Sequence, residues 1–150
     1  MEKLILDSDV LLNWLLQEVE THSSLKLWVA PSVILELGEQ RMIANQVSLI
    51  SMMEVRYVLR RKKTWPMESI EADLRQLKRI LNFIAPVQGD IEQAERLQSE
   101  DWLDPFDSII LSQAINSRSR LITRDSALIE IAKKYIAVST PEEYVNQCMN

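Results

Sequence analysis

Short apolar runs alternate with amphipathic helical segments along the whole chain, and this alternation constrains the fold more than any other feature. The first run, residues 3–7, is typical of a buried strand and is closed by an acid, and residues 10–16 then carry apolar side chains at helical spacing. The alternation continues to a last strand at 136–138 and a closing helix at 141–147. Strands joined by helices run parallel, and the helices then cover both faces of the sheet. We therefore expect one α/β domain over residues 1–150, with a parallel central sheet between helices.

The remaining elements follow from the same two patterns. We expect strands at 44–50, 83–87 and 120–123, and helices at 31–39, 52–61, 70–81, 91–98, 104–117 and 127–134. The clearest helix carries Ile70, Leu74, Leu77 and Leu81 at spacings of four, three and four, which is the period of one helix face. Pro86 weakens the strand expected around it, because proline lacks the N–H that a strand ladder uses.

Composition excludes several classes of protein. With 47% apolar residues, 26% charged residues and only 2 Gly, the chain is a packed domain rather than a linker or a disordered tail. No apolar stretch approaches the ~20 residues of a membrane span, and no signal-peptide pattern opens the chain. The single cysteine, Cys148, excludes an internal disulfide framework and a cysteine-based zinc site. We expect a soluble, cytoplasmic domain without a membrane contact.

Several common catalytic sites are also missing. There is no GxGxxG motif and no P-loop, which excludes dinucleotide and nucleoside-triphosphate sites of the usual kind. The only histidine, His22, lies in a polar stretch where a solvated loop is the expected structure. The net charge of −5 argues against a dedicated duplex-DNA binder, but it leaves room for an enzyme with a local basic patch. Any chemistry must therefore use carboxylates, hydroxyl groups and metal ions.

Acidic residues gather where the strands are expected to end, which is where sites form in open α/β sheets. These residues are Asp7, Asp9, Glu54, Asp104, Asp107 and Asp125. Each also fits a helix cap or first turn. Glu54 fits a capping box with Ser51 in the first turn of its helix, and the aspartates fit helix N-terminal ends. Taken singly, the capping explanation is as good as a functional one.

Taken together, the acids favour a metal site. Four or more carboxylates at one edge repel each other strongly at low dielectric, and a helix cap needs only one acceptor. A divalent cation such as Mg²⁺ or Mn²⁺ removes this repulsion, because carboxylate and water oxygens are its preferred ligands. Such an ion lowers the pKa of a bound water and stabilises charge on a phosphate, which suits hydrolysis of a phosphodiester bond.

Four segments, in this order and at these spacings, resemble PIN domains. They are Ile5–Leu11, Ser51–Leu59, Leu103–Ile110 with Leu121–Asp125, and Val138–Tyr144. The resemblance covers essentially the whole chain and implies a metal-dependent endoribonuclease. It further implies that the catalytic and metal-binding quartet of the family corresponds to Asp7, Glu54, Asp107 and Asp125. Many small members of the family are toxins of type II toxin–antitoxin pairs, often called VapC, which implies an RNA substrate and an antitoxin partner.

Three further residues beside the quartet are accessory positions, namely Asp9, Asp104 and Thr123. The family often has Asn or Ser where Asp9 stands, so we interpret Asp9 as a helix cap rather than as an extra ligand. The apolar content of the chain also leaves room for a homodimer.

A basic cluster follows Glu54 and comprises Arg56, Arg60, Arg61 and Lys62, with Lys63 at its end. Arg56 and Arg60 are four residues apart and therefore share one helix face. The cluster fits an RNA-backbone contact and equally fits a solvated helix end, where cations complement the helix dipole. Trp65 lies nearby, and we expect it to pack against the protein rather than to stack on a base.

Other functions stay open at this point. A phosphorylation-dependent receiver domain also has an acidic edge, with two adjacent acids after its first strand. It further needs a phosphoacceptor aspartate after its third strand and a lysine after its fifth. Here the third expected strand runs into residues 86–90 and the last ends at 138–140 without a lysine. A PIN-like binding module without catalysis would have lost its acids. A housekeeping RNA-processing or repair nuclease would share every residue above, and a neighbouring antitoxin reading frame would distinguish a toxin from it.

Overall fold

A five-stranded parallel sheet forms the centre of the structure, a computed structural model that describes residues 1–150. In spatial order, its strands are β3 (Asn82–Ile84), β2 (Ile43–Ser48), β1 (Glu2–Leu6), β4 (Arg120–Ile122) and β5 (Val138–Ser139). Every pairing is parallel, because each connecting helix returns the chain to the same end of the sheet. The predicted parallel α/β fold is confirmed.

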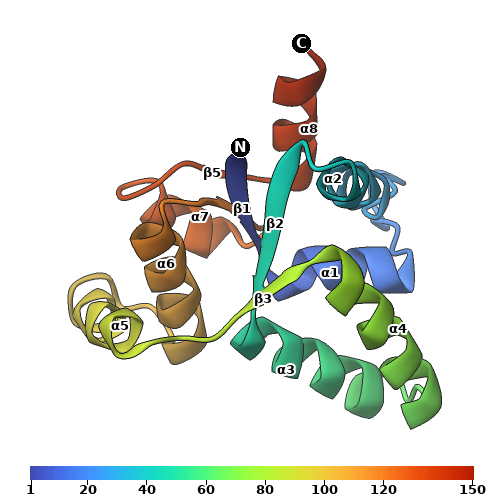
Figure 1. Ribbon diagram of the computed structural model, residues 1–150, viewed down its shortest axis with the longest axis horizontal. Coiled ribbons are helices and arrows are strands. Elements are labelled where there is room, and N and C mark those ends of the chain that lie inside the picture. The colour runs from blue at the N-terminus through green and yellow to red at the C-terminus, as the bar shows by residue number, and fades with distance from the viewer.

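Helices cover both faces of this sheet (Figure 1). The first face carries α1 (Ser8–Leu16), α2 (Val29–Glu39), α3 (Leu49–Tyr57), its π-helical extension η1 (Val58–Lys62), α4 (Met67–Ile80) and α8 (Pro141–Met149). The second face carries α5 (Gln88–Asp101), α6 (Pro105–Ser117) and α7 (Ser126–Ala132). None of these helices combines the length and the apolar composition that crossing a membrane requires.

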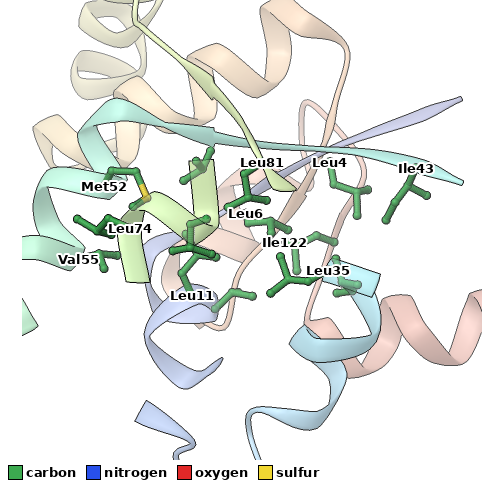
Figure 2. Packing of buried hydrophobic residues seen from close by; sticks show 14 of the residues in the cluster. Leu4, Leu6, Leu11, Leu35, Ile43, Met52, Val55, Leu74, Leu81 and Ile122 are labelled. Atoms are coloured by element: carbon green, nitrogen blue, oxygen red, sulfur yellow. The ribbon is translucent and has the colours of Figure 1, made fainter. Parts of the chain in front are cut away.

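Alternate side chains of β1 belong to two separate hydrophobic cores. Leu4 and Leu6 join a cluster of 17 buried residues with the helices of the first face, part of which Figure 2 shows. Ile5 lies between them in sequence but joins a cluster of nine buried residues with α5, α6 and α7. Successive side chains of a strand point to opposite faces, so a strand covered on both sides reads as a continuous apolar run. The run at the start of the sequence therefore marks the central strand of the sheet.

Two short strands differ from the predicted boundaries. The strand expected at 83–87 is Asn82–Ile84 and ends before Pro86, whose missing N–H cannot continue the ladder. The last strand, expected at 136–138, is Val138–Ser139. It pairs with β4 along only two residues, which is too short for a sequence period to locate.

The structure excludes the capping box that the spacing of Ser51 and Glu54 allows. Helix α3 begins at Leu49, and its N-cap is Ser48, whose hydroxyl accepts a hydrogen bond from the backbone N–H of Ile50 at 3.2 Å. Glu54 consequently lies in the second turn, and Ser51 is buried inside the helix with a hydroxyl that has no partner. Glu54 therefore has no capping role.

Candidate active site

The carboxyl ends of β1, β2 and β4 meet at one edge, since these three strands are neighbours in the sheet. Burial is the largest cause of the raised pKa values of Asp7 and Asp107. The negative charges of Glu54 and Asp125 raise the pKa of Asp7 further, and those of Asp104, Asp7 and Asp125 raise the pKa of Asp107 further. Glu54, Asp107 and Asp125 therefore each lie within electrostatic reach of Asp7. The four acids come from four separate segments of the chain, so only the sheet brings them together.

Asp7 is the most enclosed of the four. It directly follows β1, the residue is 6% exposed, and burial is the largest cause of its raised pKa. One carboxylate oxygen, Oδ1, accepts from the backbone N–H of Ser8 at 2.8 Å, which makes Asp7 the N-cap of α1. The other oxygen, Oδ2, accepts from the hydroxyl of Thr123 at 2.8 Å. These two bonds oppose the effect of burial and hold the carboxylate in one orientation.

Thr123 is fully buried directly after β4 and connects two of the acids. Its hydroxyl donates to Asp7 and accepts from the backbone N–H of Asp125 at 3.1 Å. A hydroxyl carries a single hydrogen, so the bond to Asp7 leaves none for Asp9, whose carboxylate lies at 3.5 Å. Thr123 therefore orients Asp7 and the start of α7 together.

Glu54 is an exposed residue of α3, and it is tied to the first strand through Ser8. The buried Ser8 hydroxyl donates to Oε1 of Glu54, across the boundary between α1 and α3. Ser8 thereby contributes its backbone N–H to Asp7 and its side chain to Glu54. One residue sets the relative position of two of the carboxylates.

Asp107 and Asp104 open helix α6. Asp104 is the N-cap, and its Oδ1 accepts from the backbone N–H of Asp107 at 2.9 Å, so its predicted capping role is confirmed. Burial, and then the neighbouring Asp104 carboxyl, raise the pKa of Asp107 to about 8. The accessory acid Asp104 thus lies beside a quartet member and changes its protonation.

Asp125 serves as the N-cap of α7, as the sequence predicts. Its Oδ1 accepts from the backbone N–H groups of Ala127 at 3.0 Å and Leu128 at 3.2 Å. Both bonds go to the same oxygen, which leaves the second carboxylate oxygen for another partner. Capping and membership of the acidic cluster are therefore compatible in one residue.

The prediction that Asp9 caps a helix is wrong. The N-cap of α1 is Asp7, and Asp9 instead accepts a hydrogen bond from the backbone N–H of Arg124 at 2.9 Å. Burial, followed by the charge of Asp7, raises the pKa of Asp9 to about 7. The other oxygen of Asp9, Oδ1, is buried with no hydrogen-bond partner. Asp9 is therefore a further enclosed carboxylate beside Asp7.

Sequence reasoning missed Arg124, which connects the site to its surroundings. Its guanidinium donates to Oδ1 of Asn13 in α1, to the carbonyl oxygen of Leu27 at 2.8 Å and to Glu142 of α8 at 2.8 Å. Its side chain is 19% exposed, and its backbone N–H holds Asp9. The only signal in the sequence is its place between Thr123 and Asp125, which does not reveal its partners.

The carboxylates of this site are suitable ligands for a hard divalent cation, but their positions in this structure do not surround one. No three histidine, cysteine or carboxylate side chains lie close enough to hold an ion between them as they are placed. The pKa shifts nevertheless show that the carboxylates perturb one another, and Asp9 has a buried oxygen without a partner. Mutual repulsion keeps negatively charged groups apart, and a bound cation removes that repulsion. An all-oxygen set of this kind suits Mg²⁺ or Mn²⁺.

The structure divides the predicted basic cluster into paired and free cations. Arg56 pairs with Glu71 of α4 at 2.6 Å, and Arg60 donates to the carbonyl oxygen of Trp65 at 3.2 Å. Arg61 and Lys62 are exposed at the end of η1 and form no ion pair. Trp65 packs half-buried against the larger core, as expected.

Comparison with known proteins agrees with this architecture. The family description "PIN domain" matches residues 4–134 of the chain. No curated protein sequence matches it.

Solved structures share the fold over almost the whole chain. A DNA-bound VapBC from Salmonella typhimurium has a TM-score of 0.73 at 16% sequence identity, and the match covers 94% of this chain and 99% of that chain. VapBC2 from Rickettsia felis, bound to a promoter DNA fragment, has a TM-score of 0.69 at 17% sequence identity. The match covers 92% of this chain and 98% of that chain. A toxin–antitoxin complex from Klebsiella pneumoniae has a TM-score of 0.65 at 24% sequence identity. The match covers 91% of this chain and 96% of that chain.

The raised pKa values of Asp9 and Asp107, about 7 and about 8, predict that stability falls as the pH rises. An aspartate of an unfolded chain has a pKa of about 4, so between about pH 4 and pH 8 the folded state holds protons that the unfolded chain has released. The free energy of unfolding therefore decreases with pH over this window. Asp107→Asn removes one of these protonations, and the decrease should become shallower. Urea unfolding in EDTA measures the free energy of unfolding across this pH range. A wild-type free energy of unfolding that rises from pH 5 to pH 8 would refute the raised pKa values of Asp9 and Asp107.

Arg124→Lys should destabilise the fold although it conserves the charge. A lysine cannot reproduce the branched set of bonds to Asn13, Leu27 and Glu142, and we expect a loss of about 2 kcal/mol in the free energy of unfolding. Arg118→Lys is the matched control, since Arg118 is exposed and unpaired, and its effect should stay within about 0.5 kcal/mol. Equal stabilities of the two variants in urea unfolding would show that Arg124 does not hold the site together.

Proposed function

The chain belongs to the PIN domain family, and from that premise we propose that it is a divalent-metal-dependent endoribonuclease that hydrolyses RNA phosphodiester bonds. The observation that carries the proposal is the convergence of Asp7, Glu54, Asp107 and Asp125 at one edge of the sheet. The chain offers no histidine base at this site, because its only histidine is exposed on the connection between α1 and α2 and bonds to none of these acids.

In the proposed reaction, these carboxylates would hold Mg²⁺ or Mn²⁺. Asp7 and Asp107 would be its principal ligands, and Glu54 and Asp125 would complete or orient the coordination. When bound, the ion supplies an activated water and stabilises charge on the phosphate. Thr123 and Ser8 keep Asp7 in one orientation, and Ser8 does the same for Glu54. Asp104 and Asp9 are accessory acids that adjust the charge around the principal ligands.

We further propose that the chain is the toxin of a type II toxin–antitoxin pair. The support is that the structures from Salmonella typhimurium, Rickettsia felis and Klebsiella pneumoniae are VapBC or toxin–antitoxin complexes, and their shared fold covers at least 91% of this chain. The proposal includes an antitoxin protein as a partner and a homodimer of the chain itself. Light scattering of the purified chain measures the dimer, and co-purification with the product of a neighbouring reading frame tests the antitoxin.

Asp7→Asn and Asp107→Asn should each lower RNA cleavage by several orders of magnitude, because they preserve shape but remove ligand charge. Cleavage of a labelled single-stranded RNA in Mn²⁺ measures this. Asp9→Asn keeps the shape of an accessory acid and should retain most of the activity, and Glu95→Gln on the exposed side of α5 should retain all of it.

Melting curves test metal binding independently of cleavage. An ion that binds only the folded state raises the melting midpoint, so Mn²⁺ should stabilise the wild type relative to EDTA and should stabilise Asp7→Asn less. Cleavage that persists in EDTA, or that survives Asp7→Asn in a folded protein, would exclude the metal-dependent mechanism.

Replacing Arg60, Arg61 and Lys62 with alanine should raise KM and flatten the salt dependence of RNA binding. Each lost phosphate contact reduces the salt slope by about 0.7 for a single strand. The matched control replaces Arg41, Lys78 and Arg79, which line a cavity at the opposite, amino-terminal edge of the sheet. If both triple variants change the slope equally, the cluster after Glu54 is an ordinary solvated helix end.

A further inference from the structure

A cavity of about 540 Å³ opens beside Glu54, on the outer side of α3 and η1. Most of its lining is apolar and includes Met53 and Tyr57 of α3 and Phe106 of the first turn of α6. Glu54 and Lys62 are its only charged residues. Its volume falls within the range of about 300 to 1,000 Å³ that is typical of small-ligand pockets.

The apolar side chains of this cavity are unusually exposed. Met53 is 70% exposed, Tyr57 58% and Phe106 57%. Single exposed apolar residues are normal on a protein surface, but several that line one concavity mark a binding surface. Two of the three are aromatic, so the lining carries π-systems as well as aliphatic surface.

We propose that this cavity receives an unpaired base of the RNA, next to the phosphate that is cleaved; the inference rests on the proposed function. Aromatic side chains stack on every base, because each base has a π-face, and such contacts hold single strands without strong sequence preference. Bases within a duplex are stacked inside it and cannot enter, so the cavity favours single-stranded or looped RNA.

The position of the cavity supports this occupant. Glu54 belongs to both the cavity wall and the acidic cluster, so a nucleotide bound in the cavity has its phosphate at the carboxylates. Lys62 lies on the wall without an ion pair, and Arg61 precedes it on the same exposed turn. A cation beside an aromatic surface complements the negative backbone that accompanies every base.

An apolar side chain of a protein partner, or a second copy of this chain, would also find apolar surface here. Such occupants need neither the aromatic faces nor the free lysine. Replacing the aromatic residues with leucine conserves apolar surface but removes stacking. The leucine variants therefore distinguish a bound base from a bound protein side chain.

The experiment compares two labelled oligonucleotides of equal length by fluorescence anisotropy in EDTA, where no metal-dependent cleavage occurs. One is a short single-stranded RNA, and the other carries an abasic ribose at every position. The wild type should bind the RNA about tenfold more tightly than the abasic strand, since base–aromatic stacking supplies the difference. Tyr57→Leu and Phe106→Leu should lose most of this ratio while keeping the affinity for the abasic strand. Trp102→Leu is the matched control, because Trp102 is 90% exposed at the end of α5, just before α6, and lies outside the cavity.

The inference is overturned if the wild type binds both strands equally, or if Tyr57→Leu and Phe106→Leu keep the full ratio. It is also overturned if light scattering shows that these variants turn a dimer into monomers, because the cavity is then a subunit interface. A wild type that prefers the bases but does not cleave RNA in Mn²⁺ would contradict the proposed function and not the base site. A wild type that cleaves RNA without preferring the bases would contradict only the base site.

Discussion

The rest of the structure depends on the enclosure of β1, which is covered by helices on both faces and paired with a neighbouring strand on each side. Leu4 and Leu6 belong to one core and Ile5 to the other, so the two helical layers are positioned by a single strand. Asp7 follows this strand directly and is carried into an enclosed place at the edge of the sheet. Because the neighbours of β1 run parallel to it, the segments that follow β2 and β4 arrive at the same edge. The acidic cluster is thus a consequence of how the core is built.

The cluster opposes the stability of the fold. Burial and mutual repulsion raise the pKa values of Asp7, Asp9 and Asp107, which means that their ionised forms are disfavoured in the folded state. Hydrogen bonds from Thr123 and from the backbone of Arg124 offset part of this cost. Natural proteins tolerate such local destabilisation mainly at functional sites. The proposed cation gives the arrangement a physical reason, since it would neutralise charges that the protein alone leaves in opposition.

Much of the site could be predicted from the sequence, because several acids are placed by local rules. Asp104 and Asp125 occupy N-caps that precede regular helices, and the signals for both caps lie within a few residues. The errors have local causes as well. Asp9 follows a strand and precedes an apolar helix, which is the pattern of a cap, but Asp7 fills that role first. Glu54 fits a capping box by spacing, yet α3 begins earlier because Ser48 supplies its cap.

By itself, the sequence determined the order of strands and helices along the chain, the burial of the first apolar run and the positions of the acids at the expected strand ends. These features follow from periodicity and from strand ends, which are encoded over a few consecutive residues. Only the tertiary structure decided that Arg124 binds Asn13, Leu27 and Glu142, that Arg56 is neutralised by Glu71, and that Phe106 and Tyr57 line one cavity. These contacts join residues far apart in the chain. Their partners are selected by how the helices pack on the sheet, and no spacing within a single segment records that choice.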